Sequence, residues 1–426
     1  MNDEAQLGFG TRCLHVGQGP DPQTGAAAPP IYQTSSYEFP DADAAAARYA
    51  LEEEGDVYSR VANPTVRALE ERLASLEGGV DALATASGMG ALDAASSVLA
   101  ETGDNVVCAA SVYGGTHGYL SHTAARRGIE ARFVDTLDPD AYAEAIDENT
   151  AYVHCETIAN PALVTPPFEE IADIAHERGA PLFVDNTFGT PALCRPLEHG
   201  ADVVWNSTTK WIHGSGTTLG GILVTDGSFP FEEHPEKYPE IAAPNPAFDG
   251  VTFTERFGDR ALTMTARHRG VRSLGDQQSP FDAWATMQGV ETLSLRMERH
   301  CENALAVAEF LEGHPEVSWV SYPGLESHET HDLASKYLEG GYGGMVAVGL
   351  EGGYEAAKRL CEGTEVAKFL ANIGDARTLV VHPASTTHAG LSAQEQRESG
   401  VAPEMIRLSI GIENVDDIIA DLEGAL

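Results

Sequence analysis

Lysine is scarce in this sequence, and its distribution along the chain singles out one residue. The chain has five lysines, and the first of them is Lys210, in the stretch Asn206-Ser-Thr-Thr-Lys210-Trp211. Acidic residues have replaced surface lysine almost everywhere else, so a lysine retained here suggests an amine that chemistry requires. A primary amine forms a Schiff base with an aldehyde, whereas arginine stays protonated and cannot. The alternative is a lysine that pairs with a carboxylate or extends from a strand end into solvent.

A phosphate site is suggested by the small residues Ser87-Gly-Met-Gly90, which open a predicted helix directly after a predicted strand. Free backbone N–H groups and the positive end of the helix would attract an anion there. Ser207 and Thr209 add hydroxyl groups beside Lys210, and Arg60 is able to neutralise a dianion. Small residues also permit close packing of a helix on a sheet, so this motif alone does not decide the matter.

Asp185 and Tyr113 supply the remaining candidate groups. Asp185 ends the apolar stretch 182–184, where an unpartnered charge is costly to bury, and a protonated ring nitrogen would be a suitable partner. Alternatively, Asp185 caps the next segment through backbone N–H groups. Tyr113 precedes two glycines, so its ring is free to lie over a ligand, although a core tyrosine is the commoner case. Together these residues predict a ligand with a phosphate, an aromatic nitrogen and an aldehyde, and pyridoxal 5′-phosphate (PLP) has all three.

Alternating strand and helix signals predict the frame that would bring these residues together. The expected strands are 81–86, 105–110, 151–156, 181–185 and 202–206. Three helices are expected: one from Pro64 to the glycine pair at 78–79, one that opens at Ser87-Gly-Met-Gly90 and runs to Ala100, and one over 168–178. This order predicts an α/β fold with a mostly parallel sheet covered by helices on both faces. Ligands bind beyond the carboxyl ends of the strands in such sheets, and that edge is where we expect Ser87, Glu156, Asp185 and 207–210.

The length of 426 residues predicts two domains and a terminal arm. Residues 1–62 lack steady periodicity and are expected to form an arm that contacts a neighbouring subunit. Residues 63–275 form the predicted PLP-binding domain, with an inserted loop at about 229–275. Residues 276–426 form a smaller C-terminal domain that contains one long helix (283–310) and the strands 344–350, 378–381 and 405–410.

Composition excludes several classes of partner. The formal net charge of −39 would repel nucleic acid and anionic membranes, so neither is expected as a partner, and its spread along the chain suggests adaptation to high salt. There is no signal-peptide pattern and no apolar run long enough to span a bilayer. The six cysteines are far apart and form no CxxC pair, so we expect neither disulfides nor a metal site, and a cytoplasmic location.

Several motifs resemble the Cys/Met-metabolism family of fold-type I PLP enzymes. Besides the segment around Lys210, they are Tyr58-Ser-Arg60, Ser87-Gly-Met89, Tyr113-Gly-Gly-Thr116, Glu156-Thr-Ile-Ala-Asn-Pro161 and Val184-Asp-Asn-Thr-Phe188. The resemblance runs in order from about Thr11 to Gly424. It implies an aspartate-aminotransferase-like three-layer domain with a mostly parallel sheet, a smaller α+β C-terminal domain and an N-terminal arm.

The resemblance also implies roles for individual residues. Lys210 would hold the cofactor and move protons, Asp185 would pair with the ring nitrogen, and Tyr113 would stack on the ring and assist proton transfer. The other cofactor-binding residues would be Gly88, Met89, Asn160, Ser207 and Thr209, joined by Tyr58 and Arg60 from a neighbouring subunit. Arg407 would bind the substrate α-carboxylate, with Asn372 as a second substrate-binding residue. Because the site is shared, the family requires at least a dimer and usually forms a tetramer.

Within the family, several segments resemble O-acetylhomoserine sulfhydrylases. They are 229–275, 279–284, 288–300, 372–377, 382–388 and 403–407. The resemblance implies γ-replacement, in which O-acetyl-L-homoserine and sulfide or a small thiol give L-homocysteine or methionine and acetate. Cystathionine γ-synthase and methionine γ-lyase activities are the alternatives, although γ-lyases carry a cysteine where this chain has Gly115. Ser215 departs from the His, Gln or Asp that is usual in the family, which affects the expected geometry of the loop after Lys210.

Overall fold

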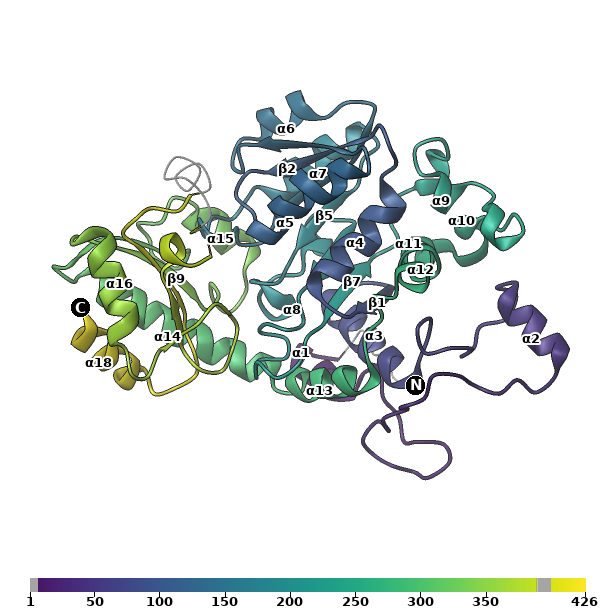
Figure 1. The fold of residues 1–426 in the computed structure, drawn as a ribbon, viewed down its shortest axis with the longest axis horizontal. Helices are drawn as coiled ribbons and strands as arrows, with labels where there is room; N and C mark the ends of the chain where they lie inside the picture. The colour runs from purple at the N-terminus through teal and green to yellow at the C-terminus, as the bar shows by residue number, and fades with distance from the viewer. Residues whose placement is uncertain (1–6, 388, 390–399) are drawn as a thin grey trace.

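Two β-sheets organise the chain, one in each half of the molecule (Figure 1). The computed structural model describes residues 7–387, 389 and 400–426. A sheet of seven strands is built from residues 81–225, and a sheet of five strands is built from residues 317–409. None of the described helices is both long and apolar enough to cross a membrane.

The seven-stranded sheet has the order β1-β7-β6-β5-β4-β2-β3. Its strands are β1 (Asp81–Thr85), β2 (Asn105–Ala109), β3 (Glu130–Val134), β4 (Thr150–Glu156), β5 (Leu182–Asp185), β6 (Val203–Asn206) and β7 (Gly221–Thr225). β7 runs antiparallel to both of its neighbours, while the pairs from β6 to β3 are parallel. Every residue of β2, β4, β5, β6 and β7 is buried, as expected for strands covered on both faces. The predicted mostly parallel sheet is therefore confirmed.

Helices α3 (Pro64–Glu77), α4 (Gly88–Leu99) and α7 (Phe168–Glu177) pack against this sheet. α3 starts with Pro64 in its first turn, capped by the Asn63 side chain, which accepts a hydrogen bond from the N–H of Thr65. It ends at Gly78, whose φ of 82° lies in the left-handed region that favours glycine. α4 starts directly after β1, with Ser87 as its N-cap. The sequence therefore predicts these helices within a residue or two of their ends.

The prediction of a loop at about 229–275 is wrong, because the segment is a run of short helical turns. It includes α9 (Pro239–Ala242), α10 (Phe253–Phe257), α11 (Ala261–Thr265), a π-turn (Ala266–Val271) and α12 (Arg272–Leu274). This run packs against α4 and buries scattered apolar side chains, among them Ile241, Phe253 and Leu262. Each helix is too short to repeat an apolar position at helical spacing, so the sequence shows no periodicity there.

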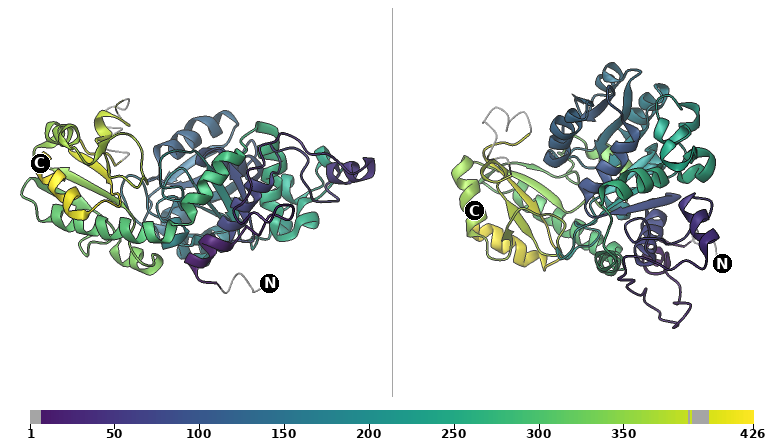
Figure 2. Two further views of the ribbon diagram at one scale, coloured as in Figure 1. Left: turned by 90° about the horizontal axis from the view of Figure 1, so that it is seen from below. Right: turned by 45° about the vertical axis from the view of Figure 1, so that its right-hand side comes forward.

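The C-terminal half carries the five-stranded sheet, with the order β10-β11-β12-β9-β8. Its strands are β8 (Val317–Ser321), β9 (Met345–Leu350), β10 (Lys368–Phe369), β11 (Leu379–Val381) and β12 (Met405–Ser409). The long helix expected at 283–310 is two helices, α13 (Pro280–Val290) and α14 (Leu293–Glu312), which meet at Glu291 and Thr292. α14 reaches from the larger sheet to the smaller one (Figure 2), where α16 (Gly353–Gly363) and α18 (Val415–Ala425) also pack.

The N-terminal segment is anchored at its start and extended beyond it. α1 (Phe9–His15) packs on α3 and α14, and the buried guanidinium of Arg72 donates to the Val16 carbonyl (2.8 Å) and to Gln18 Oε1 (2.6 Å). The following residues extend away from both sheets and carry α2 (Ala42–Tyr49) at their far end (Figures 1 and 2). After α2 the segment contacts the large half again, because Leu51 is buried and its carbonyl accepts from Arg256 Nε at 2.6 Å. This shape agrees with an arm that contacts another subunit, which remains a prediction.

Candidate active site

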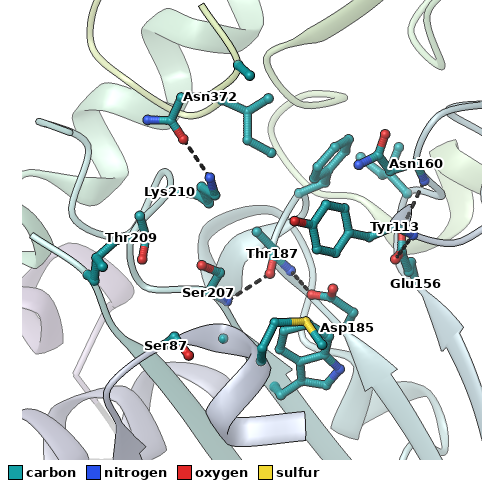
Figure 3. Close-up of a pocket in the computed structure, with 18 of the residues that line it drawn as sticks. Ser87, Tyr113, Glu156, Asn160, Asp185, Thr187, Ser207, Thr209, Lys210 and Asn372 are labelled. Carbon is teal, nitrogen blue, oxygen red and sulfur yellow. Dashed lines mark hydrogen bonds between the residues drawn. The ribbon is translucent and has the colours of Figure 1, made fainter. Parts of the chain in front are cut away.

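A cavity of about 380 Å³ opens at the carboxyl ends of the parallel strands (Figure 3). Most of the predicted site residues line it: Gly88, Met89, Tyr113, Asn160, Asp185, Ser207, Thr209, Lys210, Asn372 and Arg407. The first eight come from strand ends and turns of the large sheet, whereas Asn372 and Arg407 come from the C-terminal half. The cavity therefore lies between the two halves of the chain, and both supply polar groups to it.

Lys210 lies in the turn that follows β6, and its amine points into the cavity. Its Nζ donates a hydrogen bond of 2.5 Å to Asn372 Oδ1 (Figure 3). Burial, with a smaller contribution from the charge of Arg407, lowers the pKa of Lys210 to about 8. A much larger fraction of this amine is therefore unprotonated at neutral pH than for a lysine on the surface.

Asp185 and Glu156 are two buried carboxylates at neighbouring positions of β5 and β4. Burial raises the pKa of Asp185 to about 7, against the opposing effect of its hydrogen bonds with Thr187, whose N–H donates to Asp185 Oδ1 at 2.9 Å. Burial and the charge of Asp185 raise the pKa of Glu156 well above its usual range. Ionising both of two adjacent buried carboxylates costs much free energy. A cationic group bound in the cavity beside them would stabilise their ionised form.

Glu156 also organises the backbone around the cavity. One carboxylate oxygen accepts from the N–H of Tyr113 (2.6 Å) and the other accepts from the N–H of Asn160 (2.9 Å). The sequence places Glu156 at this sheet edge but predicts no role for it. Like Asp185, it ends an apolar strand, and that shared position is the signal for a functional carboxylate.

An anion cradle is formed by the start of α4 and the turn after β6. The Ser87 hydroxyl accepts from the N–H of Gly90 (3.1 Å), while the N–H groups of Gly88 and Met89 have no partner among the described residues. A side chain at Gly88 would lie 2.8 Å from Ser207 Cβ and 2.9 Å from the Trp205 ring, so the backbone approaches closely only because the residue is glycine. Ser207 and Thr209 line the cavity beside these N–H groups. A helix start with free N–H groups and nearby hydroxyls suits a phosphate.

Arg407 faces the cavity from β12. Its Nη1 donates to Asn160 Oδ1 at 2.8 Å, but its buried Nε has no hydrogen-bond partner in the part of the chain that the structure describes. A buried guanidinium N–H without a partner calls for an acceptor, and a carboxylate is the group that fits it best.

Tyr58 and Arg60 do not line this cavity. Both lie on the extended arm, where the Arg60 guanidinium lies over the Tyr58 ring at 5.1 Å and Tyr58 is exposed. Their contact with the cofactor of a neighbouring subunit remains a prediction. Ser215 is also outside the cavity, and its carbonyl accepts from Arg377 Nη2 at 3.3 Å. The motif that ends at His388 reaches a residue that lies outside the described ones.

Trp205 is a lining residue that the sequence analysis did not identify. It lies two positions before Ser207, so both side chains lie on the same face of the strand. Its indole N–H donates to His154 Nε2 at 3.2 Å, and burial lowers the pKa of His154 to about 3, which keeps that ring neutral. The hydrogen bond to His154 thereby fixes the Trp205 ring in the wall of the cavity.

The groups of the cavity fit PLP. An amine with a lowered pKa, a buried carboxylate and a helix start with free N–H groups correspond to the aldehyde, the ring nitrogen and the phosphate. Within residues 7–387, 389 and 400–426, no group of three or more His, Cys, Asp or Glu side chains is placed to hold a metal ion.

Comparison with known proteins gives matches over almost the whole chain. A family model described as Cys/Met metabolism PLP-dependent enzyme matches residues 10–426. The chain is 48% identical to the homocysteine synthase of Schizosaccharomyces pombe, over 98% of each protein. It is also 48% identical to O-acetyl-L-homoserine sulfhydrylase 1 of Thermus thermophilus, over 98% of this chain and 99% of that protein.

Solved structures give the same result. A protein of Campylobacter jejuni described as an O-acetylhomoserine (thiol)-lyase is 39% identical, with a TM-score of 0.95 over 98% of this chain and 99% of that one. Its structure contains N′-pyridoxyl-lysine-5′-monophosphate. The metB protein of Corynebacterium glutamicum is 35% identical, with a TM-score of 0.84 over 100% of this chain and 99% of that one.

Proposed function

The chain belongs to the Cys/Met metabolism family of PLP-dependent enzymes, and on this premise we propose that it is an O-acetylhomoserine sulfhydrylase. The reaction converts O-acetyl-L-homoserine and sulfide, or a small thiol, to L-homocysteine or methionine and acetate. The observation that carries the proposal is the near-full-length similarity to O-acetyl-L-homoserine sulfhydrylases. The family and the α/β fold both agree with the predictions made from the sequence.

Bound PLP supplies an aldehyde for the substrate amino group and a ring that withdraws electrons from the substrate Cα. Lys210 accepts the Cα proton at Nζ, because a pKa of about 8 leaves part of this amine free at neutral pH. Asn372 Oδ1, 2.5 Å from Nζ, orients the amine. Replacement at the γ-carbon also requires loss of a proton from the β-carbon, and among the described lining residues Lys210 and Tyr113 are suited to take it up.

Asp185 holds a proton on the ring nitrogen of PLP. Because the Asp185 carboxylate is buried, its ionised form needs a cationic partner, and a protonated pyridine nitrogen is one. Gly88, Met89, Ser207 and Thr209 would hold the phosphate of PLP. These assignments follow from the cavity groups described above and are tested by substitution of each residue.

Arg407 positions the amino-acid substrate. Its buried Nε, which lacks a partner among the described residues, donates to the substrate α-carboxylate, while Asn160 holds Nη1 on the other side of the guanidinium. Ile158, Phe188 and Ile373 also line the cavity and keep water away from the reacting carbons.

Gly115 bears on the choice between replacement and elimination. Methionine γ-lyases carry a cysteine at this position, and a Cβ here would lie 2.3 Å from Cε1 of Tyr113. A cysteine would therefore require a different position of the Tyr113 ring. Glycine at 115 supports the replacement reaction for this chain.

Product analysis tests the proposed activity. Purified enzyme with PLP is given O-acetyl-L-homoserine together with sulfide, methanethiol or L-cysteine in separate reactions, and Lys210→Ala is the control. In the reaction with sulfide, we expect the enzyme to form homocysteine and an equal amount of acetate. Faster formation of cystathionine with L-cysteine than of homocysteine with sulfide, or rapid release of 2-oxobutyrate without any thiol, contradicts the proposal and favours one of the two alternative activities.

We also propose that the active unit is an oligomer, at least a dimer and in full a tetramer, in which Tyr58 and Arg60 complete the site of a neighbouring subunit. Their exposed position on the arm, outside their own cavity, supports this. Mixing two inactive variants, Lys210→Ala and Arg60→Ala, under conditions of subunit exchange should restore activity, because a mixed dimer contains one intact site. If no activity returns although subunits exchange, the shared site is refuted.

The composition of the chain bears on the location of the enzyme and on the salt concentration at which it works. We propose a cytoplasmic enzyme adapted to high salt, supported by the net charge of −39 and by six free, buried cysteines. Its thermal midpoint should rise with KCl from dilute buffer to molar concentration, because salt screens repulsion among the carboxylates. A midpoint independent of KCl contradicts the adaptation.

A further inference from the structure

Glu77 is a fully buried carboxylate for which the proposed mechanism has no use. It is the last residue of α3 and does not belong to the described lining of the cavity. Burial raises the pKa of Glu77 to about 7, while hydrogen bonds from Asn206 and Asn186 oppose that shift. Burying a carboxylate in this way costs free energy, so its position calls for an explanation.

The contacts of Glu77 connect two strand ends. Asn186 Nδ2 donates to both carboxylate oxygens, at 3.1 and 3.2 Å, and Asn206 Nδ2 donates to Oε1 at 2.6 Å. Asn186 follows the end of β5 and Asn206 is the last residue of β6. One side chain of α3 therefore joins the ends of two strands that it does not belong to.

Each of these asparagines is the chain neighbour of a cavity residue. Asn186 follows Asp185, and Asn206 precedes Ser207. The network also reaches β4, because Asn186 Oδ1 accepts from Thr157 Oγ1 at 2.7 Å, and Thr157 follows Glu156. Neighbouring residues at a strand end point to opposite sides, so the asparagines face α3 while Asp185 and Ser207 face the cavity.

We propose that Glu77 is a positioning residue that fixes the ends of β5 and β6, so that Asp185 and Ser207 meet the ring nitrogen and the phosphate of PLP together. Asn186 and Asn206 both donate to Glu77, and an ionised carboxylate is able to accept all three of these hydrogen bonds. Glutamine at this position keeps the volume but directs an NH₂ group at a donor. The inference rests on the PLP site of the proposed function and does not depend on which thiol is the substrate.

The chain offers a matched control in Glu70, seven residues earlier on α3. It is also buried and charged, but it pairs with Arg267 Nη2 (2.8 Å) and accepts from the N–H of Ala84 (2.8 Å), outside the described lining of the cavity. Glu70→Gln therefore makes the same chemical change in the same helix without touching the asparagine network.

The experiment measures PLP binding by the apoproteins of the wild type, Glu77→Gln and Glu70→Gln. Equilibrium titration gives the Kd, visible circular dichroism of the saturated proteins reports how firmly the ring is held, and thermal unfolding of the apoproteins gives their stability. We expect Glu77→Gln to raise the Kd about tenfold, which is the lower end of the effect known for residues that orient the ligands of a metal ion. We also expect it to weaken the visible dichroism per bound PLP. Glu70→Gln should lower apoprotein stability at least as much but keep the wild-type Kd and dichroism.

A wild-type Kd and dichroism in Glu77→Gln, or equal losses in both variants, overturn the proposal, because the effect is then absent or general. If Glu77→Gln does not fold, Asn206→Ala replaces it, since it removes the β6 contact alone, and the same outcomes apply. PLP binding by the wild type tests the cofactor assignment separately, so a failure of the sulfhydrylase proposal remains distinguishable from a failure of this one.

Discussion

Arg407→Lys separates the charge of Arg407 from the shape of its guanidinium group, because lysine keeps the charge but not the forked arrangement of donors. Lysine keeps the positive charge that helps to lower the pKa of Lys210, so the amine retains its free fraction. A lysine amine cannot, however, replace both Nη1, which donates to Asn160 Oδ1, and Nε, which is to donate to the substrate carboxylate. We therefore expect the loss of one charge-assisted hydrogen bond to the substrate carboxylate, about 1.5–3 kcal/mol.

That loss corresponds to a rise of about 10- to 150-fold in the KM for O-acetyl-L-homoserine, with a smaller change in kcat. The assay measures initial rates of homocysteine formation over a range of O-acetyl-L-homoserine at saturating sulfide. Arg359→Lys, an exposed arginine of α16, is the control and should leave KM unchanged. An unchanged KM in Arg407→Lys, or a loss of PLP binding by this variant, refutes the assignment of Arg407 to the substrate carboxylate.

Two further predictions concern the cofactor site. Asp185 has a folded pKa of about 7 against 3.8 when free, so its ionisation destabilises the apoprotein as pH rises between these values. PLP-free Asp185→Asn should therefore be more stable than the PLP-free wild type at pH 8, by up to about 4 kcal/mol, and the difference should be smaller at pH 4. The variant should also bind PLP weakly. Equal urea-unfolding curves of the two proteins at pH 8 contradict this prediction. Gly88→Ala places a Cβ 2.8 Å from Ser207 Cβ and should raise the Kd for PLP about tenfold or more by displacing the phosphate cradle. A wild-type Kd for this variant rules out the close approach at Gly88.

The sequence predicts the chemical core of the site because three of its parts follow strands that end at one edge of a sheet. Ser87 and Ser207 come just after such strands and Asp185 is the last residue of one, so in a parallel sheet their convergence is a matter of topology. Arg407 is different, because by its residue type alone it is an ordinary charged residue at a strand edge, where it would aid solubility. Its position depends on how the C-terminal half docks on the large sheet, and its role is predicted only through the family resemblance.

Other features depend on tertiary contacts that a sequence does not encode locally. Glu77 reads as an ordinary charged residue at a helix end, yet it is buried because α3 ends against β5 and β6. The segment 229–275 reads as loop because its helices are too short to show a period. Tyr58 and Arg60 lie on the arm, outside the cavity, and their role in the site of a second copy of the chain remains a prediction.

The central claim is that Lys210 holds PLP, and borohydride reduction tests it most directly. The holoenzyme is reduced, digested and mapped by mass spectrometry to locate the pyridoxyl group. We expect a stoichiometric label on Lys210, whose amine is the one lysine nitrogen among the described lining of the cavity. A label on Lys237, Lys336, Lys358 or Lys368 in place of Lys210 contradicts the account of the site and of the reaction built on it.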